Sequence, residues 1–505
     1  MALAAISLVS RLPQLLSPNL LVDGDEATLG LMARHLAQGK EFPIFFYGQH
    51  YGFSSVEAAA GALGFAIFGT GALPLKLAIL ALWTLGILFL FLAQSRLLGA
   101  GRSFWITSVL LLNPAWAVWS MKARGGYVTS FTATAALLWL LMTDRERPSV
   151  VRWLIAGLLT SIIYLAQPLW LPGLLPILIV ALVLRRRLLW GASYLSVTAA
   201  AIFLIKLAPV TSADPWGGPP LGNADLIGSL PGVGEQIYVN LTGSYYLWWS
   251  LDPPGPATRI LAFVWYGVLP AAVLIQLYRL HTKQYSLWSH LLFASVCSTL
   301  VAEWVLLGAR DGRYLLPLSA LLALLAGIEV VDFVDRRLLG RGTAFALTLA
   351  VLLLGGQSMN EFRSFSYLWN NPPGSLTEAV RLRRMVSYLK ARGITHVFSM
   401  NGLLQWQLMF YSDEEVLARG TVEIDRYPAY VSAVDAALAN GEAVAVVGYT
   451  NDSGAPGCQT IPVCTGGIQG LVPNPDQIST VDDKYFIYPG ANKELLKKLG
   501  FQLPD

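Results

Sequence analysis

The chain has 505 residues, of which 55% are hydrophobic and only 13% are charged. Soluble proteins carry about 25% charged residues, so this composition excludes ordinary soluble domains as well as disordered, collagen-like and coiled-coil chains. The net charge of +4 is too small in a chain of this length to indicate nucleic-acid binding. The sequence therefore predicts a polytopic membrane protein.

Apolar stretches close to the length that crosses a bilayer recur through residues 1–357 and predict about eleven transmembrane helices. Segment 152–184 contains Pro168, Pro172 and Pro176, which suit either a helical hairpin or one kinked helix. The predicted spans are 2–21, 72–94, 103–120, 127–143, 152–168, 169–184, 188–208, 259–279, 287–308, 314–332 and 342–357.

Basic residues of the short connections are concentrated on one side of this predicted topology. The positive-inside rule makes that side cytoplasmic, so segments 22–71 and 209–258 and everything after about 358 are predicted outside. We therefore expect a multi-pass protein of a bacterial inner (plasma) membrane. The connections predicted inside carry Arg96, Arg102, Arg145, Arg147, Arg152, Arg185, Arg186, Arg187, Arg279, Lys283, Arg336, Arg337 and Arg341.

The first outer loop, residues 22–71, is the most polar part of the membrane region. Asp25 and Glu26 precede apolar residues at helical spacing, which predicts a short amphipathic helix at the membrane surface, ended by Gly39. Two interpretations of the acidic pair stay open, because Asp25 suits a helix N-cap with Glu26 in the first turn as well as it suits catalysis. His35 is expected on the surface of this helix. Tyr47, Gln49, His50 and Tyr51 follow, and Glu57 heads a second apolar helix.

The second outer loop, residues 209–258, is rich in proline, glycine and aromatic residues and contains no Lys or Arg. Its aromatic side chains are expected in the lipid headgroup region, or alternatively stacked on a sugar or lipid, with the headgroup position favoured. These side chains are Tyr245, Tyr246, Trp248 and Trp249.

The composition changes after about residue 358. Helical patterns alternate with short β-branched runs at 396–400 and 443–449, which predicts a small extracytoplasmic α/β domain over 358–505. Cys458 and Cys464 are separated by five residues, and we expect a small disulfide loop rather than a metal site there.

Several ionisable residues lie near the outer ends of different predicted spans. Snorkelling toward the interface explains any one of them, whereas their coincidence favours a polar cavity that opens to the outer leaflet and holds an anionic headgroup. Lys76, Lys206 and Glu303 lie within spans at about the depth of Lys122, Arg124, Arg310 and Arg313.

Arg310 and Arg313 form the best-defined cationic element, at the mouth of a predicted span. A spacing of three can place both guanidinium groups on one helical face, where they would bind phosphate oxygens strongly and selectively. The alternative is that Asp311 or Glu303 simply neutralises them.

The stretch DGDEATLGLMARHLAQGKEFPIFFYGQHYGFSSVEA, followed by many spans and then RYLLPL, resembles the integral-membrane GT-C glycosyltransferases. The branch it resembles contains protein O-mannosyltransferases and the aminoarabinose transferases of lipid A. The resemblance implies a GT-C-like catalytic domain over 1–357 that transfers a sugar from a polyprenyl-phosphate donor at the outer face. It also implies that Asp25, beside Glu26, is the catalytic base, that Glu57 is a second acidic position, and that Arg313 with Arg310 contacts the lipid phosphate.

This chemistry needs a base for the acceptor hydroxyl and a cation for the charge that grows on the leaving phosphate. Direct attack predicts inversion at the anomeric carbon, with a lipid, a glycan or a protein as the acceptor and Arg124 as a further cation for the phosphate. Asp25, Glu26, His50 and Glu57 offer ligands that a divalent metal could use, and metal binding stays open. The rival interpretations are a transporter or flippase of lipid-linked sugars, or a membrane-anchored glycan-binding protein; the sequence lacks the midplane charges and repeated halves expected of a transporter.

Overall fold

The computed structural model describes residues 1–17, 20, 22–40, 42–49, 52–146, 149–183, 188–207, 225–243, 255–283, 287–307, 312–331, 340–362, 378–422, 425–450, 472–482 and 484–504. The chain divides into two compact units. Unit 1 consists of Met1–Ser17, Lys76–Leu207 and Gly218–Phe365, and unit 2 of Pro18–Leu75, Ala208–Gly217 and Ser366–Asp505. Residues of the first loop therefore belong to the same unit as the C-terminal region.

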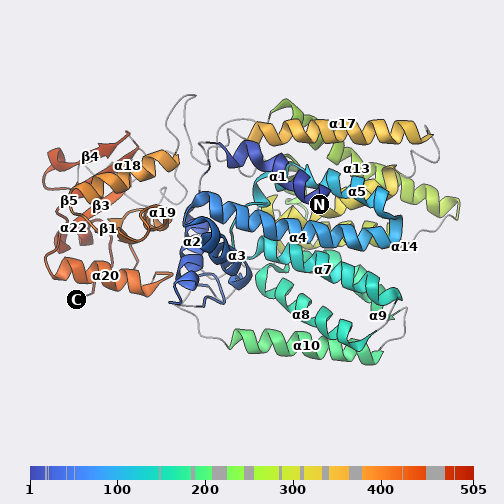
Figure 1. Ribbon diagram of the computed structural model, residues 1–505, viewed down its shortest axis with the longest axis horizontal. Coiled ribbons are helices and arrows are strands. Elements are labelled where there is room, and N and C mark those ends of the chain that lie inside the picture. Colours follow the sequence, from blue (N-terminus) through green and yellow to red (C-terminus); the bar gives the residue numbers. More distant parts are fainter. Residues whose placement is uncertain are drawn as a thin grey trace. The chain divides into compact units, whose positions relative to one another are not determined.

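The regular secondary structure in the described residues of unit 1 is entirely helical (Figure 1). Every predicted apolar stretch forms helix over most of its length. The elements are α1 (Ala2–Leu15), α4 (Ala72–Leu98), α5 (Ala100–Leu111), α6 (Trp116–Trp119), α7 (Tyr127–Glu146), α8 (Val150–Ala166), η1 (Pro168–Trp170), α9 (Leu171–Val183), α10 (Leu188–Lys206), α11 (Leu230–Thr242), α13 (Pro256–His281), α14 (Leu287–Ala302), η2 (Glu303–Leu307), η3 (Gly312–Leu315), α15 (Leu316–Leu325), η4 (Ala326–Val331) and α17 (Gly340–Glu361).

Three helices in the described part of the chain are long and apolar enough to cross a membrane, namely Ala72–Leu98, Pro256–His281 and Leu287–Leu306. Val150–Ala166 and Pro168–Leu182 are long and apolar enough only when taken together, and their bend of 119° makes them either one broken span or a re-entrant loop. Proline at the start of the second helix provides no backbone N–H to continue the first, which explains the break. Several shorter apolar helices accompany these spans, and the total of eleven stays a prediction.

The predicted span 103–120 is wrong as a continuous helix, because α5 ends at Leu111 and Pro114 precedes the short helix α6. The buried side chain of Arg11 donates hydrogen bonds to backbone carbonyls on both sides of this break. Its guanidinium donates to the carbonyl of Leu111 at 2.5 Å and to that of Trp116 at 3.1 Å. The buried Arg11 of α1 thus gives these carbonyls hydrogen bonds that lipid could not provide.

Unit 2 contains α2 (Gly24–Ala37) and α3 (Ser55–Phe68) together with a small α/β region, as predicted for the C-terminal part of the chain. The five-stranded sheet has the order β2-β1-β3-β5-β4, with parallel pairing from β2 to β3 and antiparallel pairing from β3 to β4. The elements are α18 (Glu378–Ala391), β1 (His396–Ser399), α19 (Gly402–Tyr411), β2 (Leu417–Arg419), α20 (Pro428–Ala439), β3 (Val444–Tyr449), η8 (Pro475–Gln477), β4 (Ser479–Val481), β5 (Tyr485–Pro489) and α22 (Lys493–Lys498).

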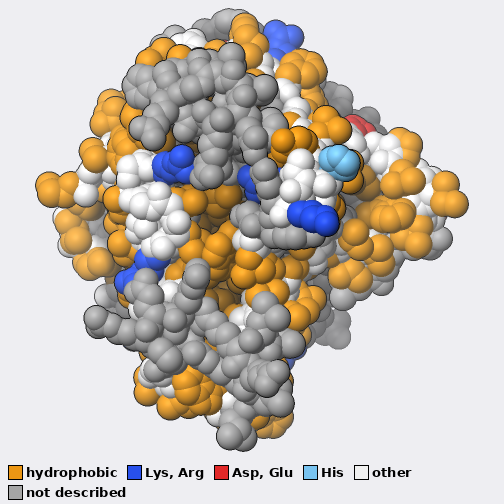
Figure 2. Space-filling model, turned by 90° about the vertical axis from the view of Figure 1, so that its right-hand side faces the viewer, with side chains coloured by type: hydrophobic (Ala, Val, Ile, Leu, Met, Phe, Trp, Pro, Cys, Tyr) orange, Lys and Arg blue, Asp and Glu red, His pale blue; other side chains and the backbone are white. Residues whose placement is uncertain are grey.

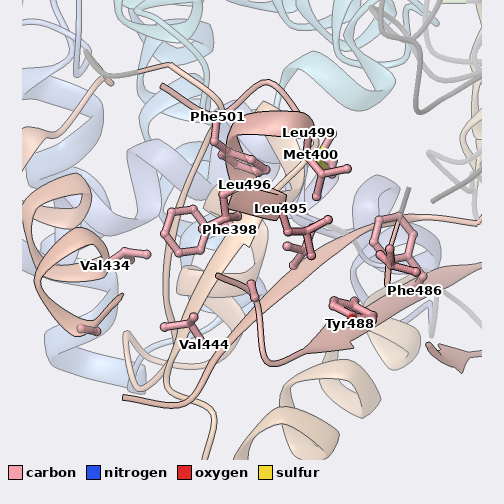
Figure 3. Close-up of a cluster of buried hydrophobic side chains, with 14 residues drawn as sticks. Phe398, Met400, Val434, Val444, Phe486, Tyr488, Leu495, Leu496, Leu499 and Phe501 are labelled. Atoms are coloured by element: carbon pink, nitrogen blue, oxygen red, sulfur yellow. The ribbon is translucent and has the colours of Figure 1, made fainter. Parts of the chain in front are cut away.

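Helices α20 and α22 cover one face of this sheet with apolar side chains (Figure 3). Phe398 of β1 and Val444 of β3 pack against Val434 of α20 and Leu496 of α22, and all four are buried. Burial on both sides explains why β1 and β3 read as continuous apolar runs in the sequence.

Helix α2 is not the amphipathic surface helix that the sequence predicts. Most of its residues are buried, because α3 and α19 pack on its different sides. Glycine makes the approach of α19 possible, since a Cβ at Gly30 would overlap the ring of Phe410 and a Cβ at Gly24 would lie 2.6 Å from that of Leu403. Helix α2 therefore packs against other helices on more than one of its faces.

Candidate functional site

The N-terminus of α2 carries a capping box built by Asp23 and Glu26. The Asp23 carboxylate accepts a hydrogen bond from the Glu26 N–H at 2.9 Å, and the Glu26 carboxylate accepts one from the Asp23 N–H at 3.2 Å. The N-cap is therefore Asp23, which corrects the assignment of Asp25 to that position. The Asp-x-x-Glu spacing in the sequence was the signal for this arrangement.

Asp25 lies in the first helical turn and is the predicted carboxylate that reaches the surface. Its side chain is 15% exposed, whereas Glu26 and Glu57 are buried. Glu26 holds the capping box, and Glu57 lies in the first turn of α3, as predicted. Of these three carboxylates, Asp25 is thus the one that solvent reaches.

Arg426 contacts Asp25 and was not identified from the sequence. Its guanidinium donates to Oδ1 of Asp25 at 2.9 Å and also lies 3.5 Å from the hydroxyl of Thr28. The guanidinium carbon lies 5.1 Å from the ring centre of Phe46, a cation–π contact from the first loop. No motif marks Arg426, because 401 positions separate it from Asp25.

Gly48 allows the first loop to lie against the backbone of Arg426. Its φ of +72° is in the left-handed region, and a Cβ there would lie only 2.8 Å from the Cα of Arg426. The loop returns through an antiparallel bridge between Phe45 and Phe53. Glycine at this point thus fixes the loop beside the Asp25–Arg426 pair.

His35 is buried, which corrects the prediction that it lies on the surface. Its Nδ1 lies 2.8 Å from the Tyr47 hydroxyl, and its Nε2 lies 3.0 Å from a carboxylate oxygen of Glu414. Tyr430 donates a hydrogen bond to the same oxygen at 2.8 Å. Tyr427 stacks on Tyr47 with ring centres 4.9 Å apart, so the first loop and the helix α20 segment share one polar aromatic cluster.

Burial and the neighbouring polar groups shift the pKa of Glu414 in opposite directions. Burial raises the pKa of its carboxyl, but the hydrogen bonds from His35 and Tyr430 and the charges of His35 and Lys40 outweigh this effect and lower the pKa to about 2. Burial and the neighbouring carboxylate raise the pKa of the Tyr430 hydroxyl. The carboxylate therefore stays ionised and Tyr430 stays a donor at neutral pH.

The predicted basic residues lie in unit 1. Arg313 is half-buried in η3, where its guanidinium lies 5.1 Å from the ring centre of Tyr314 and donates to the Tyr314 hydroxyl at 3.3 Å. The Asn240 amide donates to the carbonyl of Gly312 at 2.9 Å and holds η3 on α11. The Asn240 contact thus holds the backbone next to Arg313, and the Tyr314 contacts hold its guanidinium.

Lys122 and Arg124 lie in the connection between α6 and α7. Lys122 is buried and Arg124 is half-buried. The Gln167 side chain donates to the carbonyl of Gly125 at 2.9 Å, and Gly126, with φ of +84°, would place a Cβ 2.7 Å from that of Ala166. The connection is therefore fixed against the end of α8.

The structure describes only some of the remaining predicted site residues. Tyr47 is buried and Gln49 is half-buried in the first loop. In the described parts of the chain, no group of three His, Cys, Asp or Glu side chains is arranged to hold a metal ion. His50, Tyr51, Tyr245, Tyr246, Trp248, Trp249, Arg310, Cys458 and Cys464 lie outside the described residues.

Comparison with known proteins gives similarity in structure only. No family model matches the chain, and no curated protein matches it in sequence. The structure of ArnT from Cupriavidus metallidurans bound to undecaprenyl phosphate has a TM-score of 0.59 at 14% identity, covering 97% of each chain. The oligosaccharyltransferase of Archaeoglobus fulgidus, in complex with Zn and sulfate, has a TM-score of 0.53 at 13% identity, covering 89% of this chain and 68% of its own. In fold, the chain is therefore similar to the structure of ArnT over nearly its full length and to that of the oligosaccharyltransferase over 89% of its residues.

Proposed function

We propose that this protein is a membrane glycosyltransferase that moves a sugar from a polyprenyl-phosphate-linked donor to an acceptor hydroxyl. The observation that carries the proposal is the partly exposed Asp25 carboxylate, to which the Arg426 guanidinium donates a hydrogen bond at 2.9 Å. The fold supports it, because a structure with similar fold, ArnT, is described as bound to undecaprenyl phosphate. The proposed location is the inner membrane, with the catalytic groups and the C-terminal region outside.

Asp25 is the base in this proposal. Its carboxylate accepts the proton of the acceptor hydroxyl while the acceptor oxygen forms a bond to the anomeric carbon. The bond from that carbon to the phosphate oxygen breaks on the opposite side, so the product is inverted and a polyprenyl phosphate leaves. Phosphate needs no general acid, in contrast to the leaving groups of ordinary glycoside hydrolysis. Burial of Glu26 and Glu57 favours Asp25 over them for this role.

Arg313 is the proposed contact for the donor phosphate, with Arg310, Arg124 and Lys122 as further cations. A planar guanidinium can donate two parallel hydrogen bonds to phosphate oxygens, which gives both strength and orientation. The contact of Arg313 with Tyr314 holds the guanidinium before substrate arrives. A cation that is already oriented stabilises the charge on the leaving phosphate without further rearrangement.

The experiment is a transfer assay with the full chain in liposomes. The donors are undecaprenyl phosphate carrying a pentose or a hexose, and the acceptors are envelope lipids, glycans and proteins from a bacterial extract. Mass spectrometry should detect both free undecaprenyl phosphate and a new glycosylated product. Translocation of the donor without any product would instead identify a flippase, and retention of the glycan without either would identify a binding protein; both results would contradict the proposal.

A further inference from the structure

Helix α3 exposes apolar side chains and buries its polar ones. Leu63, Ile67 and Phe68 are 62%, 62% and 65% exposed, whereas Ser55 and Glu57 are buried. This distribution is the reverse of that on a helix which faces water. Every residue of α3 that is not buried is apolar, namely Val56, Ala59, Ala60, Ala62, Leu63, Ala66, Ile67 and Phe68.

Helix α22 of the same unit has the ordinary distribution. Leu495 and Leu496 are buried, and the exposed residues of this helix are the charged Lys493, Glu494, Lys497 and Lys498. The surface of unit 2 is therefore not apolar in general. A contiguous exposed apolar face such as that of α3 marks a surface that contacts another protein or a membrane.

The opposite side of α3 is occupied by protein. Helix α2 packs there, and a Cβ at Gly61 would lie only 2.9 Å from that of Ala33 and 3.1 Å from a methyl group of Leu75. The buried side of α3 thus already has its partners within unit 2. Only the outward face requires one.

The chain connection from α3 to α4 indicates what this partner is. Three residues, 69–71, join the two helices, so Phe68 lies at most about 14 Å from Ala72 at the start of α4. Helix α4 is one of the helices that are long and apolar enough to cross a membrane. Its first residues, up to Leu75, belong to unit 2 together with α3, and Leu73 among them is 40% exposed. The exposed apolar side chains of α3 therefore lie beside the point at which α4 enters the bilayer.

The length of α3 decides how it contacts the bilayer. Its 14 residues extend about 21 Å, compared with about 30 Å for the hydrocarbon core. Helix α3 is therefore too short to cross the core, and the turn at Gly69, with φ of +80°, separates it from α4. A helix of this kind, apolar along one whole side, lies in the plane of the interface.

The basic residues at the other end of α4 indicate the leaflet. Arg96 near the end of α4 and Arg102 near the start of α5 are both exposed. Figure 2 views the end of unit 1 that carries the labels of α9 and α14 in Figure 1, and it shows several Lys and Arg side chains on a mainly hydrophobic face with little acidic surface. The positive-inside rule assigns the basic end to the cytoplasm, so α4 starts in the outer leaflet.

We propose that the outward face of α3 inserts into the outer leaflet, with Leu63, Ile67 and Phe68 among the acyl chains next to the headgroups. This face carries no charged side chain, since Glu57 is the only ionisable residue of α3 and is buried. Insertion therefore depends on apolar burial and not on the charge of the lipid. The inference does not depend on sugar transfer.

Spin-label accessibility of the full chain in phosphatidylcholine nanodiscs tests the proposal. The label is attached to Ile67→Cys after replacement of the three native cysteines by serine. Val422→Cys is the matched control, because Val422 is an apolar residue of unit 2 that is 41% exposed but lies outside the membrane-connected helix. The ratio of collisions with oxygen to collisions with a water-soluble nickel chelate should be several-fold higher at Ile67→Cys.

A second measurement uses the unaltered protein, so it does not depend on the folding of any variant. Phosphatidylcholine with a diazirine near the glycerol end of one acyl chain should cross-link to the peptide of α3 and not to that of α22. Replacing the phosphatidylcholine by phosphatidylglycerol should leave this yield unchanged.

Three results would overturn the proposal. Equal collision ratios at Ile67→Cys and Val422→Cys would show that water reaches the face of α3. Low collision rates with both reagents at Ile67→Cys would show that protein, such as a second copy of the chain, covers it. Lipid cross-links that leave out the α3 peptide would exclude insertion in the unaltered protein.

Discussion

Asp25 and Arg426 form an ion pair of 2.9 Å although 401 positions separate them in the chain. Asp25 belongs to the first loop, and Arg426 follows the strand β2 of the C-terminal region. Both side chains are partly exposed, so the pair is accessible from solvent. The C-terminal region therefore contributes directly to the orientation of the carboxylate that we propose as the base.

Replacing Arg426 by alanine should slow sugar transfer while leaving donor binding nearly unchanged. A carboxylate that is displaced by about 1 Å loses on the order of 10²-fold in rate, so we expect a decrease of about 10- to 100-fold in kcat. Lysine at this position should restore part of the rate, because it keeps the charge without the guanidinium geometry. Steady-state kinetics with undecaprenyl-phosphate sugars measures both effects.

Arg384→Ala is the matched control for Arg426→Ala. Arg384 also pairs with an aspartate of unit 2, Asp482, at 2.7 Å, but its side chain is 54% exposed and lies apart from Asp25 in sequence and in its contacts. Its loss should leave kcat unchanged. Wild-type kcat in the Arg426→Ala protein would show that the ion pair has no part in catalysis.

Replacing Arg313 by alanine should lower kcat by about 10²-fold or more, the usual loss when an oriented group that stabilises transition-state charge is removed. Arg313→Lys should recover only part of this loss, because an ammonium group cannot donate two parallel hydrogen bonds to phosphate. Arg259→Ala, at an exposed arginine of α13, serves as the control in unit 1. Equal kcat values for the two alanine variants would remove Arg313 from the mechanism.

Gly30→Ala should loosen the contact between α2 and α19. The added methyl group overlaps the ring of Phe410, and overpacking of this kind costs about 1–3 kcal/mol. Hydrogen exchange should therefore become faster in both helices. Gly402→Ala is the control, because nothing lies within 4 Å of a Cβ at this position of α19. Unchanged exchange in the Gly30→Ala protein would contradict the close packing of the two helices.

Acid should weaken the contacts of α2 through Glu414. Because the pKa of Glu414 in the folded chain, about 2, lies below its ordinary value of 4.5, its stabilising effect is complete above about pH 4.5 and is lost as the pH falls toward 2. Hydrogen exchange in α2, corrected for the intrinsic effect of pH, should accelerate over this interval. Glu414→Gln should lose about 2 kcal/mol of stability at neutral pH and show a smaller change with acid. An identical pH profile in wild type and variant would contradict this role of Glu414.

The sequence predicted those features that depend on local patterns. Apolar length identified most helices of unit 1, but not α11, which lies in the predicted second outer loop; continuous β-branched runs identified β1 and β3. The break between helices α5 and α6 at Pro114 was missed, because the residues on both sides are apolar enough to be predicted as one continuous span. Helix α19 was missed as well, since its mostly apolar sequence carries little amphipathic pattern.

The candidate site depends on contacts between distant residues, and this limited its prediction. The sequence placed Asp25 at the start of a helix, although as the N-cap, a position that Asp23 occupies, and its partner Arg426 has no local signal. His35 was predicted on the surface because its partner Glu414 lies 379 positions away. Long-range pairing of charged groups cannot be read from the spacing of residues in one chain.

The most direct test of the account is the rate of sugar transfer by the Asp25→Asn protein. Asparagine keeps the size of the side chain and removes the base, so kcat should fall by about 10²- to 10⁴-fold while the protein stays folded. Asp476→Asn, at an exposed aspartate of η8, should transfer sugar at the wild-type rate. Transfer by the Asp25→Asn protein within about twofold of the Asp476→Asn control would contradict the assignment of Asp25 as the base.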